Sequence, residues 1–370
     1  MDKYPAIIDL ARKAKKRIPK VAREYLVSGT GSEDLVKKNL ESFKNITFTP
    51  QFCKGEIHPN IKTKLLGQTF NAPFGMAPVG LAGLMWPKAE QILANTARTY
   101  GIPYTLSTVG TETPEVVGPI AGDMGWFQLY PPKRKEIRSS ILQRAKEAGF
   151  HTLVVTIDVP TPSRRERTMR AGLKAPPKIT PSFIWDGITH PKWTMETLKN
   201  GLPKLKTVSQ YAEKNKIRSI HDFVEKELGA NLSWEYCKEI RDEWDGPIVL
   251  KGVLHPKDAE NAIKIGMDGI VVSNHGGRQF DGAPTAIDVL PEIAKVAKGK
   301  TAILFDSGVR SGLDIMRALH LGAEFVLLGR PFIYGVAALG KLGGDHTTEI
   351  LMEDLKNNMI QLGINSLNKL

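Results

Sequence analysis

Eight short apolar runs recur along residues 74–329, and most are followed by a stretch with the spacing of an amphipathic helix. Near-continuous apolar runs are typical of strands that are buried on both faces of a parallel sheet. Gly149, Gly266 and Gly322 come directly after three of the helical stretches, where a helix is expected to end. The eight predicted strands are 74–77, 104–107, 126–130, 153–158, 248–251, 269–273, 302–306 and 325–329.

This succession predicts an α/β fold, a (β/α)8 TIM barrel. The fourth and fifth predicted strands are much further apart than the others, so we expect a long insertion after strand 4, at about residues 170–232. Residues 1–70 are predicted to form a helical N-terminal extension with a short strand pair around 57–70, and residues 71–370 to form the barrel domain. A doubly wound open sheet is the alternative, but no glycine-rich dinucleotide fingerprint follows the first predicted strand.

Cysteine usage and hydropathy exclude several classes of protein. The two cysteines, Cys53 and Cys237, form no CxxC pair, so neither a disulfide framework nor a zinc site is expected. The first residues lack the apolar run of a secretory signal, and no stretch approaches 18 uninterrupted apolar residues. We therefore expect a cytoplasmic protein without a membrane-spanning helix.

The net charge of +12 is concentrated in two segments, 1–23 and 170–206. An excess of this size favours anionic partners, although a solvated basic face explains it equally well. No nucleic-acid-binding motif and no platform of alternating aromatic and basic residues is present, so nucleic acid is not an expected partner.

Polar residues end seven of the eight predicted strands. In barrels of this type the chemistry gathers at the C-terminal ends of the strands. A single polar residue there is often only a helix cap, but seven on one rim predict a functional site. The residues are Ser107, Gln128 with Tyr130, Thr156 with Asp158, Lys251, Ser273 with His275, Asp306, and Arg330.

His275 is the best candidate for a general base, because imidazole titrates near neutral pH. Gly276 and Gly277 follow it and allow the backbone to approach a ligand closely, and Arg278 offers a planar fork that suits a carboxylate. Asp158 is a candidate to orient and stabilise the imidazolium. Lys251 is expected to hold a positive charge where a cofactor gains electrons.

The loops after the last two predicted strands, 306–312 and 328–331, have the composition of a phosphate site. Small residues expose backbone N–H groups there, and Arg310 and Arg330 add positive charge. The carboxylates and histidines lack ligand spacing, so we predict no metal.

The segment Ser273-Asn274-His275-Gly276-Gly277-Arg278-Gln279, with Asp281 close behind, resembles the active-site segment of the FMN-dependent 2-hydroxy-acid oxidase/dehydrogenase family. The resemblance extends from about residue 18 to 367. It implies FMN as cofactor, a homotetramer, and oxidation of an (S)-2-hydroxy acid to the 2-oxo acid. Electrons then pass to a quinone, another carrier or dioxygen. A flavin barrel of other chemistry, such as an isomerase or reductase, and a non-catalytic barrel that binds phosphate or membrane are the alternatives.

The resemblance also implies a role for each matching residue. His275 corresponds to the catalytic histidine, with Asp158 as its partner and Tyr130 near the substrate hydroxyl. The substrate-binding residues would be Tyr25, Arg165, Arg278 and Tyr130. The FMN-binding residues would be Ala77, Pro78, Val79, Ser107, Gln128, Thr156, Lys251 and Ser273, with Asp306, Gly308, Arg310, Gly329 and Arg330 at the ribityl and phosphate end.

Two features bear on specificity. Val109 occupies a position where the glycolate oxidases carry tryptophan, so we expect a roomier pocket and a substrate larger than glycolate. The insertion most resembles that of the bacterial L-lactate and mandelate dehydrogenases. Its part at 170–206 is basic and contains Phe183, Trp185 and Trp193, which predicts peripheral contact with the inner face of a membrane. A mobile active-site lid is the equally weighted alternative.

Overall fold

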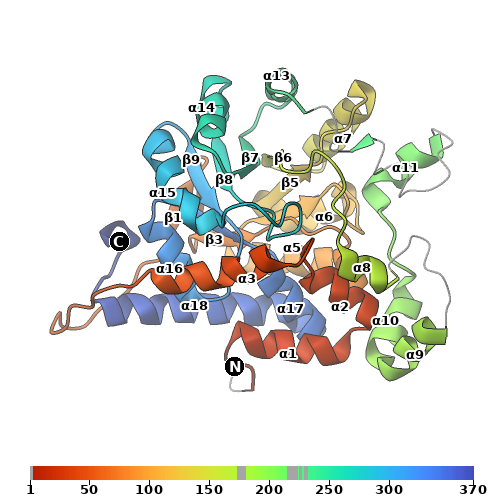
Figure 1. The fold of residues 1–370 in the computed structure, drawn as a ribbon, viewed down its shortest axis with the longest axis horizontal. Helices are drawn as coiled ribbons and strands as arrows, with labels where there is room; N and C mark the ends of the chain where they lie inside the picture. The colour runs from red at the N-terminus through yellow and green to blue at the C-terminus, as the bar shows by residue number, and fades with distance from the viewer. Residues whose placement is uncertain (1–2, 173–180, 215–223, 225–226, 229–231) are drawn as a thin grey trace.

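Eight parallel strands close into a barrel in the computed structural model, which describes residues 3–172, 181–214, 224, 227–228 and 232–370 (Figure 1). Going round the barrel, the order is β10, β3, β4, β5, β6, β7, β8 and β9, so each strand lies next to its neighbours in sequence and the last pairs with the first. The TIM barrel is confirmed, and the open sheet is excluded. The strands are β3 (Phe74–Met76), β4 (Tyr104–Ser107), β5 (Gly125–Leu129), β6 (Thr152–Thr156), β7 (Ile248–Val253), β8 (Gly269–Val272), β9 (Ala302–Phe305) and β10 (Phe325–Leu328).

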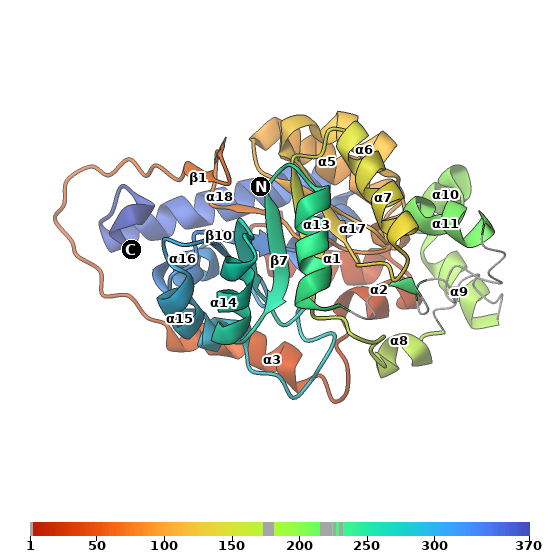
Figure 2. The ribbon, with the colours of Figure 1, turned by 90° about the horizontal axis from the view of Figure 1, so that it is seen from above.

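Helices follow the strands and form the outer layer of the barrel (Figure 2). Several begin at the caps that the sequence provides: Ser311 and Thr285 each accept a hydrogen bond from a backbone N–H of the helix they begin. The helices of this layer are α4 (Ala82–Met85), α5 (Ala89–Tyr100), α6 (Pro114–Ala121), α7 (Lys135–Glu147), α13 (Trp234–Glu243), α14 (Pro256–Lys264), α15 (Ala286–Ala297), α16 (Gly312–His320), α17 (Arg330–Leu339) and α18 (Gly343–Leu362).

Large apolar side chains fill the barrel at the N-terminal ends of its strands. The short antiparallel pair β1 (Thr63–Leu65) and β2 (Gln68–Phe70) lies there, and the Phe70 ring packs edge-on against Trp126 and Phe325. All three rings are fully buried, which stabilises the fold by about 1.5–3 kcal/mol for each apolar side chain of this size. Because this end is closed, a ligand site inside the barrel has to lie at the other end.

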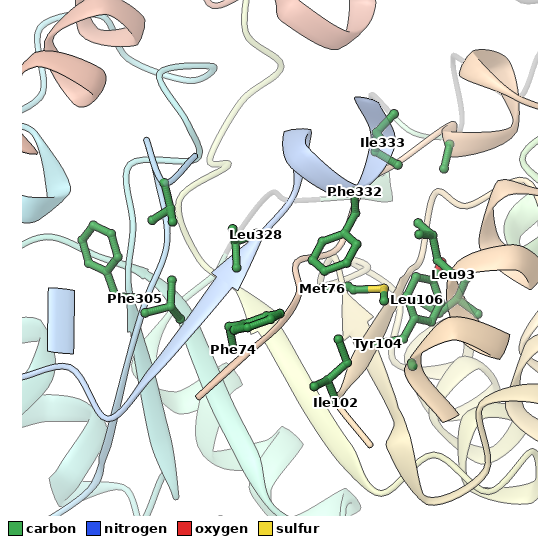
Figure 3. Close-up of a cluster of buried hydrophobic side chains, with 14 of the residues drawn as sticks. Phe74, Met76, Leu93, Ile102, Tyr104, Leu106, Phe305, Leu328, Phe332 and Ile333 are labelled. Carbon is green, nitrogen blue, oxygen red and sulfur yellow. The ribbon is translucent and has the colours of Figure 1, made fainter. Parts of the chain in front are cut away.

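A second core lies between the strands and the surrounding helices. Figure 3 shows Met76 and Tyr104 on neighbouring strands facing Leu93 of α5 and Phe332 of α17. These side chains are all buried. Alternate residues of one strand therefore contribute to the barrel interior and to the helix layer, which explains why the strands are apolar throughout.

The N-terminal extension packs on the barrel through α1 (Ile7–Arg17), α2 (Lys20–Val27), α3 (Asp34–Glu41) and the 3-10 turn η1 (Ser42–Asn45). Helix α1 lies against α17, and Phe43 of η1 packs edge-on against Phe305 at the end of β9, with 6.0 Å between ring centroids. The Phe43 contact brings η1 to the open end of the barrel.

Between β6 and α13 the chain forms α8 (Glu166–Arg170), α9 (Pro181–Thr189), α10 (Pro191–Asn200) and α11 (Lys206–Lys214). Figure 1 and Figure 2 show α9 and α10 at the end of the molecule opposite the C-terminus. Trp193 of α10 is buried, and its indole nitrogen donates to the Leu84 carbonyl at 3.0 Å. The prediction of an interfacial Trp193 is therefore wrong, because this side chain anchors the insertion to the barrel.

Candidate active site

Six of the polar residues predicted at the strand ends form two hydrogen-bonded groups, which together make an arc at the open end of the barrel. Ser107 Oγ donates to Gln128 Oε1 at 2.8 Å, and Gln128 Nε2 donates to Thr156 Oγ1 at 2.9 Å. Further round, Lys251 Nζ donates to Ser273 Oγ at 3.0 Å and pairs with Asp306 Oδ2 at 2.9 Å. The six side chains of this arc come from six consecutive strands, or from the residue directly after a strand, and all six are buried.

Lys251 carries its charge in this buried arc. Burial alone lowers the pKa of an amine, but the carboxylates of Asp306 and Asp158 outweigh burial here, and the pKa of Lys251 lies above its usual value. The ammonium group is therefore charged at neutral pH.

His275 and Asp158 form a hydrogen-bonded pair, with 2.9 Å between Nδ1 and Oδ1. The other ring nitrogen, Nε2, faces the Tyr130 hydroxyl at 3.4 Å. Burial lowers the pKa of His275 despite the opposing effect of Asp158, and the charges of Lys251 and Arg165 add to this lowering. The imidazole is consequently neutral at pH 7, and its Nε2 is free to accept a proton when Nδ1 donates to Asp158.

Asp158 and Tyr130 complete the environment of this base. Burial raises the pKa of Asp158, but the interaction with His275 and then the charge of Lys251 outweigh it, so the pKa is lowered and Asp158 is ionised. Its second oxygen, Oδ2, is buried without a hydrogen-bond partner among the described residues. Burial, and then the negative charge of Asp158, raise the pKa of Tyr130 to about 12, so its hydroxyl remains protonated.

Gly252 makes room for Asp158, and the sequence analysis did not identify it. Its φ is +110°, and a Cβ built on it would lie 2.5 Å from the Asp158 Cβ. The pairing of β7 with β8 is irregular at this residue, between Lys251 and Val253. Only glycine fits, because both the backbone angle and the space exclude a side chain. The one available signal was a glycine directly after the strand-end lysine.

Four arginines near the open end of the barrel lack a carboxylate partner among the described residues. Arg278 donates to the carbonyls of Tyr25 at 2.8 Å and Ser28 at 2.9 Å, and its guanidinium lies over the Tyr25 ring. Burial and then the charge of Arg165 lower the pKa of Arg278 to about 9. Half-buried cations that repel each other indicate a site for an anion.

A second cationic site involves Arg330 and Arg310. Arg330 donates to the carbonyls of Leu26, Ser28 and Gly276. Burial and then the charge of Arg310 lower the pKa of Arg330 to about 10.

Gly308 and Gly329 lie in the same two loops as Arg310 and Arg330. The Asn39 carbonyl is packed against Gly308, and Val79 and Ala77 lie beside Gly329. The Arg310–Arg330 pair is suited to a phosphate group, as the loop composition predicted.

Tyr25 reaches the site from α2, far away in sequence from the barrel. Its hydroxyl donates to the Gly80 carbonyl at 3.1 Å, and a Cβ on Gly80 would lie 2.7 Å from Val109. Tyr25, Gly80 and Val109 therefore lie against one another, and the Tyr25 ring also lies against Arg278. Arg165 lies near enough to influence the pKa values of Arg278 and His275, so the structure brings all the predicted substrate residues together.

An ion-pair network holds the segment that carries Tyr25, and the sequence did not reveal it. Arg167 of α8 pairs with Glu24 and with Glu33, the latter at 2.6 Å, on either side of Tyr25 along the chain. Ser28 and Thr168 are also hydrogen-bonded, at 2.8 Å between their hydroxyl oxygens. The start of the insertion is thus fastened to the N-terminal extension.

The groups present fit FMN. The arc from Ser107 to Asp306 offers donors, acceptors and one ammonium group to a polar ring system, and the Arg310–Arg330 site offers charge to a phosphate. Within the residues that the structure describes, no group of three or more His, Cys, Asp or Glu side chains could hold a metal ion.

Comparisons with known proteins agree with this geometry. The family model of the FMN-dependent dehydrogenases matches residues 14–370. The L-lactate dehydrogenases of Pseudomonas aeruginosa (strain LESB58) and Pseudomonas paraeruginosa (strain DSM 24068 / PA7) are each 38% identical to this chain, over 99% of it and 96% of their own length.

Solved structures of the same kind superpose closely. A monotopic membrane protein, (S)-mandelate dehydrogenase, has a TM-score of 0.92 at 34% identity, over 99% of this chain and 97% of its own. A mandelate oxidase has a TM-score of 0.82 at 30% identity, over 99% and 96%. Similarity of this length and degree, on a barrel whose open end carries these groups, shows that the chain belongs to the FMN-dependent dehydrogenase family.

Proposed function

We propose that this protein oxidises L-lactate, or a closely related (S)-2-hydroxy acid such as (S)-mandelate, to the 2-oxo acid. FMN-dependent oxidation of a 2-hydroxy acid is the activity of the family to which the chain belongs. The observation that carries the assignment of residues is the His275–Asp158 pair, with Nε2 free to act as a base beside arginines that need an anion.

We assign the following roles in substrate binding and catalysis. Arg278 and Arg165 bind the substrate carboxylate together with the Tyr25 hydroxyl, and Tyr130 hydrogen-bonds the substrate hydroxyl. His275 accepts a proton at Nε2, and Asp158 stabilises the resulting imidazolium. FMN, when bound, would accept the two electrons together with the second of the two protons that the substrate loses. Lys251 would place a positive charge beside the reduced cofactor, which carries negative charge.

The remaining predicted residues hold the cofactor in this proposal. Ser107, Gln128, Thr156 and Ser273 bind its polar ring, with Ala77, Pro78 and Val79 packed against it. Asp306, Gly308, Arg310, Gly329 and Arg330 bind the ribityl chain and the phosphate. The hydrogen bonds within the arc and the repulsion between Arg310 and Arg330 support this division. The homotetramer implied by the resemblance stays a prediction.

We propose that the substrate side chain lies beside Val109, next to Tyr25 and Gly80. Val109 contacts the position that a side chain on Gly80 would need, so the wall here consists of one small residue and one glycine. Because valine and glycine take up little space, this wall in our proposal accepts a methyl group or a larger group. This is the basis for preferring lactate and mandelate to glycolate.

We expect L-lactate to bleach the flavin absorbance of the protein under anaerobic conditions, while D-lactate and glycolate leave most of it unchanged. After bleaching, an artificial dye or a quinone is expected to restore the absorbance faster than dioxygen, because the similarity to proteins named dehydrogenases leads us to propose a carrier as the acceptor. The measurement is the visible spectrum in a stopped-flow cell. Absence of bleaching by both L-lactate and (S)-mandelate would exclude the proposed substrate class, and faster recovery with dioxygen would exclude the proposed acceptor.

We also propose that residues 170–206, in the inserted segment, dock on an anionic membrane. None of the described helices combines the length and the apolar character needed to cross a bilayer. Helices α9 and α10 nevertheless expose large apolar side chains next to lysines: Trp185 is 65% exposed, Ile188 65% and Leu198 80%. Lys192 and Lys199 are exposed on α10. Residues 173–180 of the predicted contact segment, and the side chain of Phe183, lie outside the described part.

The vesicle experiment separates a membrane contact from a lid. We expect the protein to sediment with phosphatidylglycerol vesicles at low salt, and Trp185→Ser to lower the partition coefficient by about tenfold, the effect of removing one large apolar side chain from the bilayer boundary. Phe52→Ser is the matched control, since Phe52 is 70% exposed on the loop before β1. No sedimentation, or equal losses in both variants, rules out docking through α9 and α10.

A further inference from the structure

The loop that carries His275 has an unfavourable backbone. His275 has φ +57°, and Gly276 and Gly277 follow at +65° and +74°, so three consecutive residues are left-handed. A histidine in this region is uncommon, and such a conformation persists only where neighbouring groups hold it. The placement of Nε2 therefore depends on contacts outside the loop.

The Asn274 side chain provides two of the hydrogen bonds that hold this loop. Its Oδ1 accepts from the Gly277 backbone N–H at 3.2 Å, and its Nδ2 donates to the Pro284 carbonyl at 3.1 Å. Its backbone N–H donates to Ser307 Oγ, which also accepts from Gly276 N–H. The side-chain amide thus joins the residue before the left-handed turn to Gly277, the last residue of the turn.

The other partner of Asn274 comes from the N-terminal extension. Asn39 of α3 and Asn274 exchange two hydrogen bonds: Asn39 Nδ2 donates to Asn274 Oδ1 at 2.9 Å, and Asn274 Nδ2 donates to Asn39 Oδ1 at 2.7 Å. Both side chains are buried, at 2% and 4% exposure. This paired amide contact fixes the orientation of Asn274, because a flipped amide would set donor against donor and acceptor against acceptor.

Helix α3 is itself held against two loops of the site. Asp281 Oδ1, beyond the His275 turn, accepts from the Leu35 backbone N–H at 2.9 Å. On the other side, a Cβ on Gly308 would lie 2.2 Å from the Asn39 carbonyl oxygen, so the loop after β9 contacts the backbone of Asn39 directly. Asn39 therefore sits where the histidine loop and the predicted phosphate loop both meet the extension.

We infer that Asn39 is a positioning residue for the reaction: through Asn274 it holds the left-handed loop that places His275 against Asp158 and Tyr130. The inference rests on the proposed role of His275. It adds that the N-terminal extension helps to set the catalytic geometry as well as supplying Tyr25. Asn39 itself touches neither the imidazole nor the substrate site.

Asn39→Leu removes both hydrogen bonds and keeps the volume of the side chain. We expect kcat to fall by about tenfold to a hundredfold, which is the effect of a small misplacement of a catalytic group. The FMN content should remain that of the native protein, because the carbonyl packed against Gly308 is unchanged. A kcat within twofold of the native value, in a variant that keeps its FMN, would contradict the inference.

Asn39→Asp gives a readout that a merely structural role would not produce. A protonated carboxyl group can donate to Asn274 Oδ1 and accept from Asn274 Nδ2 as the amide does, whereas the ionised form cannot donate. Burial favours the protonated form. We expect this variant to lose activity as the pH rises, while the native enzyme gains activity because His275 loses its proton.

The ionisable groups that face His275 are Asp158, Tyr130, Lys251 and Arg165, and all remain in this variant. Charged residues on the elements packed against α3 include Arg278 and Asp281 on the histidine loop, Lys44 on η1, Asp288 on α15, and Asp306 and Arg310 on the loop after β9. Asn95→Asp, on the exposed side of α5, is the control for an added carboxylate. The inference fails if Asn39→Asp, folded and yellow, has the pH profile of Asn95→Asp. The proposed function is tested separately, by bleaching of the native protein.

Discussion

His275→Gln is expected to lower kcat for L-lactate by about a hundredfold to ten-thousandfold, the usual contribution of a general base. Glutamine has a similar reach and can still hydrogen-bond Asp158, but its amide has no basic nitrogen. The variant would therefore keep the contact with Asp158 but could no longer accept the substrate proton. We expect the variant to remain yellow, since the arc of residues that is suited to FMN does not include the imidazole.

The control for this substitution is His346→Gln. His346 lies on α18, and its Nε2 bonds to the Tyr4 carbonyl at 2.8 Å, away from the barrel rim. The kcat of the His346→Gln variant should match that of the native protein. The assignment of His275 as the base is wrong if His275→Gln, with full FMN content, keeps more than about a tenth of native kcat.

The pH profile provides a further check on the same residue. Protonation at Nε2 blocks the base, so kcat/KM falls as the pH drops through the pKa of His275. Burial lowers that pKa although Asp158 opposes it, so the acid limb is expected below the usual histidine value of about 6.5. The limb should be absent from the residual activity of His275→Gln.

The sequence predicted the barrel well because strand and helix periodicity are local. All eight predicted strands are present, with small differences at their ends. β6 stops at Thr156 and β9 at Phe305, so Asp158 and Asp306 lie just past the strands that were predicted to include them. The chain leaves the sheet at the rim, and side chains there are free to turn inward.

The contacts with the N-terminal extension could not be predicted in the same way. The Asn39–Asn274 pair and the ion pairs of Arg167 join segments more than 130 residues apart. Nothing in the local pattern of α3 or α8 indicates which buried partner each residue meets. The roles of Gly252 and Trp193 could not be predicted for the same reason. Gly252 makes room for Asp158 and Trp193 anchors the insertion, and both roles depend on contacts that exist only in the packed molecule.

Arg278→Leu is expected to lower kcat/KM for L-lactate by about thirtyfold to several thousandfold. Removing one partner of an enclosed charge pair costs about 2–5 kcal/mol, at tenfold for each 1.4 kcal/mol. Arg278→Lys keeps the charge but not the planar fork, and we expect a smaller loss, mostly in KM. Arg98→Leu, on the exposed side of α5, is the control and should leave kcat/KM unchanged.

A substrate analogue shows whether the lost partner is the carboxylate. Lactamide replaces the carboxylate of L-lactate with a neutral amide, so in the native enzyme it gives up the charge interaction with Arg278. In Arg278→Leu that interaction is already gone, and exchanging L-lactate for lactamide should then change kcat/KM by much less. If the loss from the substitution and the loss from the analogue instead multiply, Arg278 acts on something other than the carboxylate. Arg165 would then be the residue that binds it, since its charge acts on both Arg278 and His275.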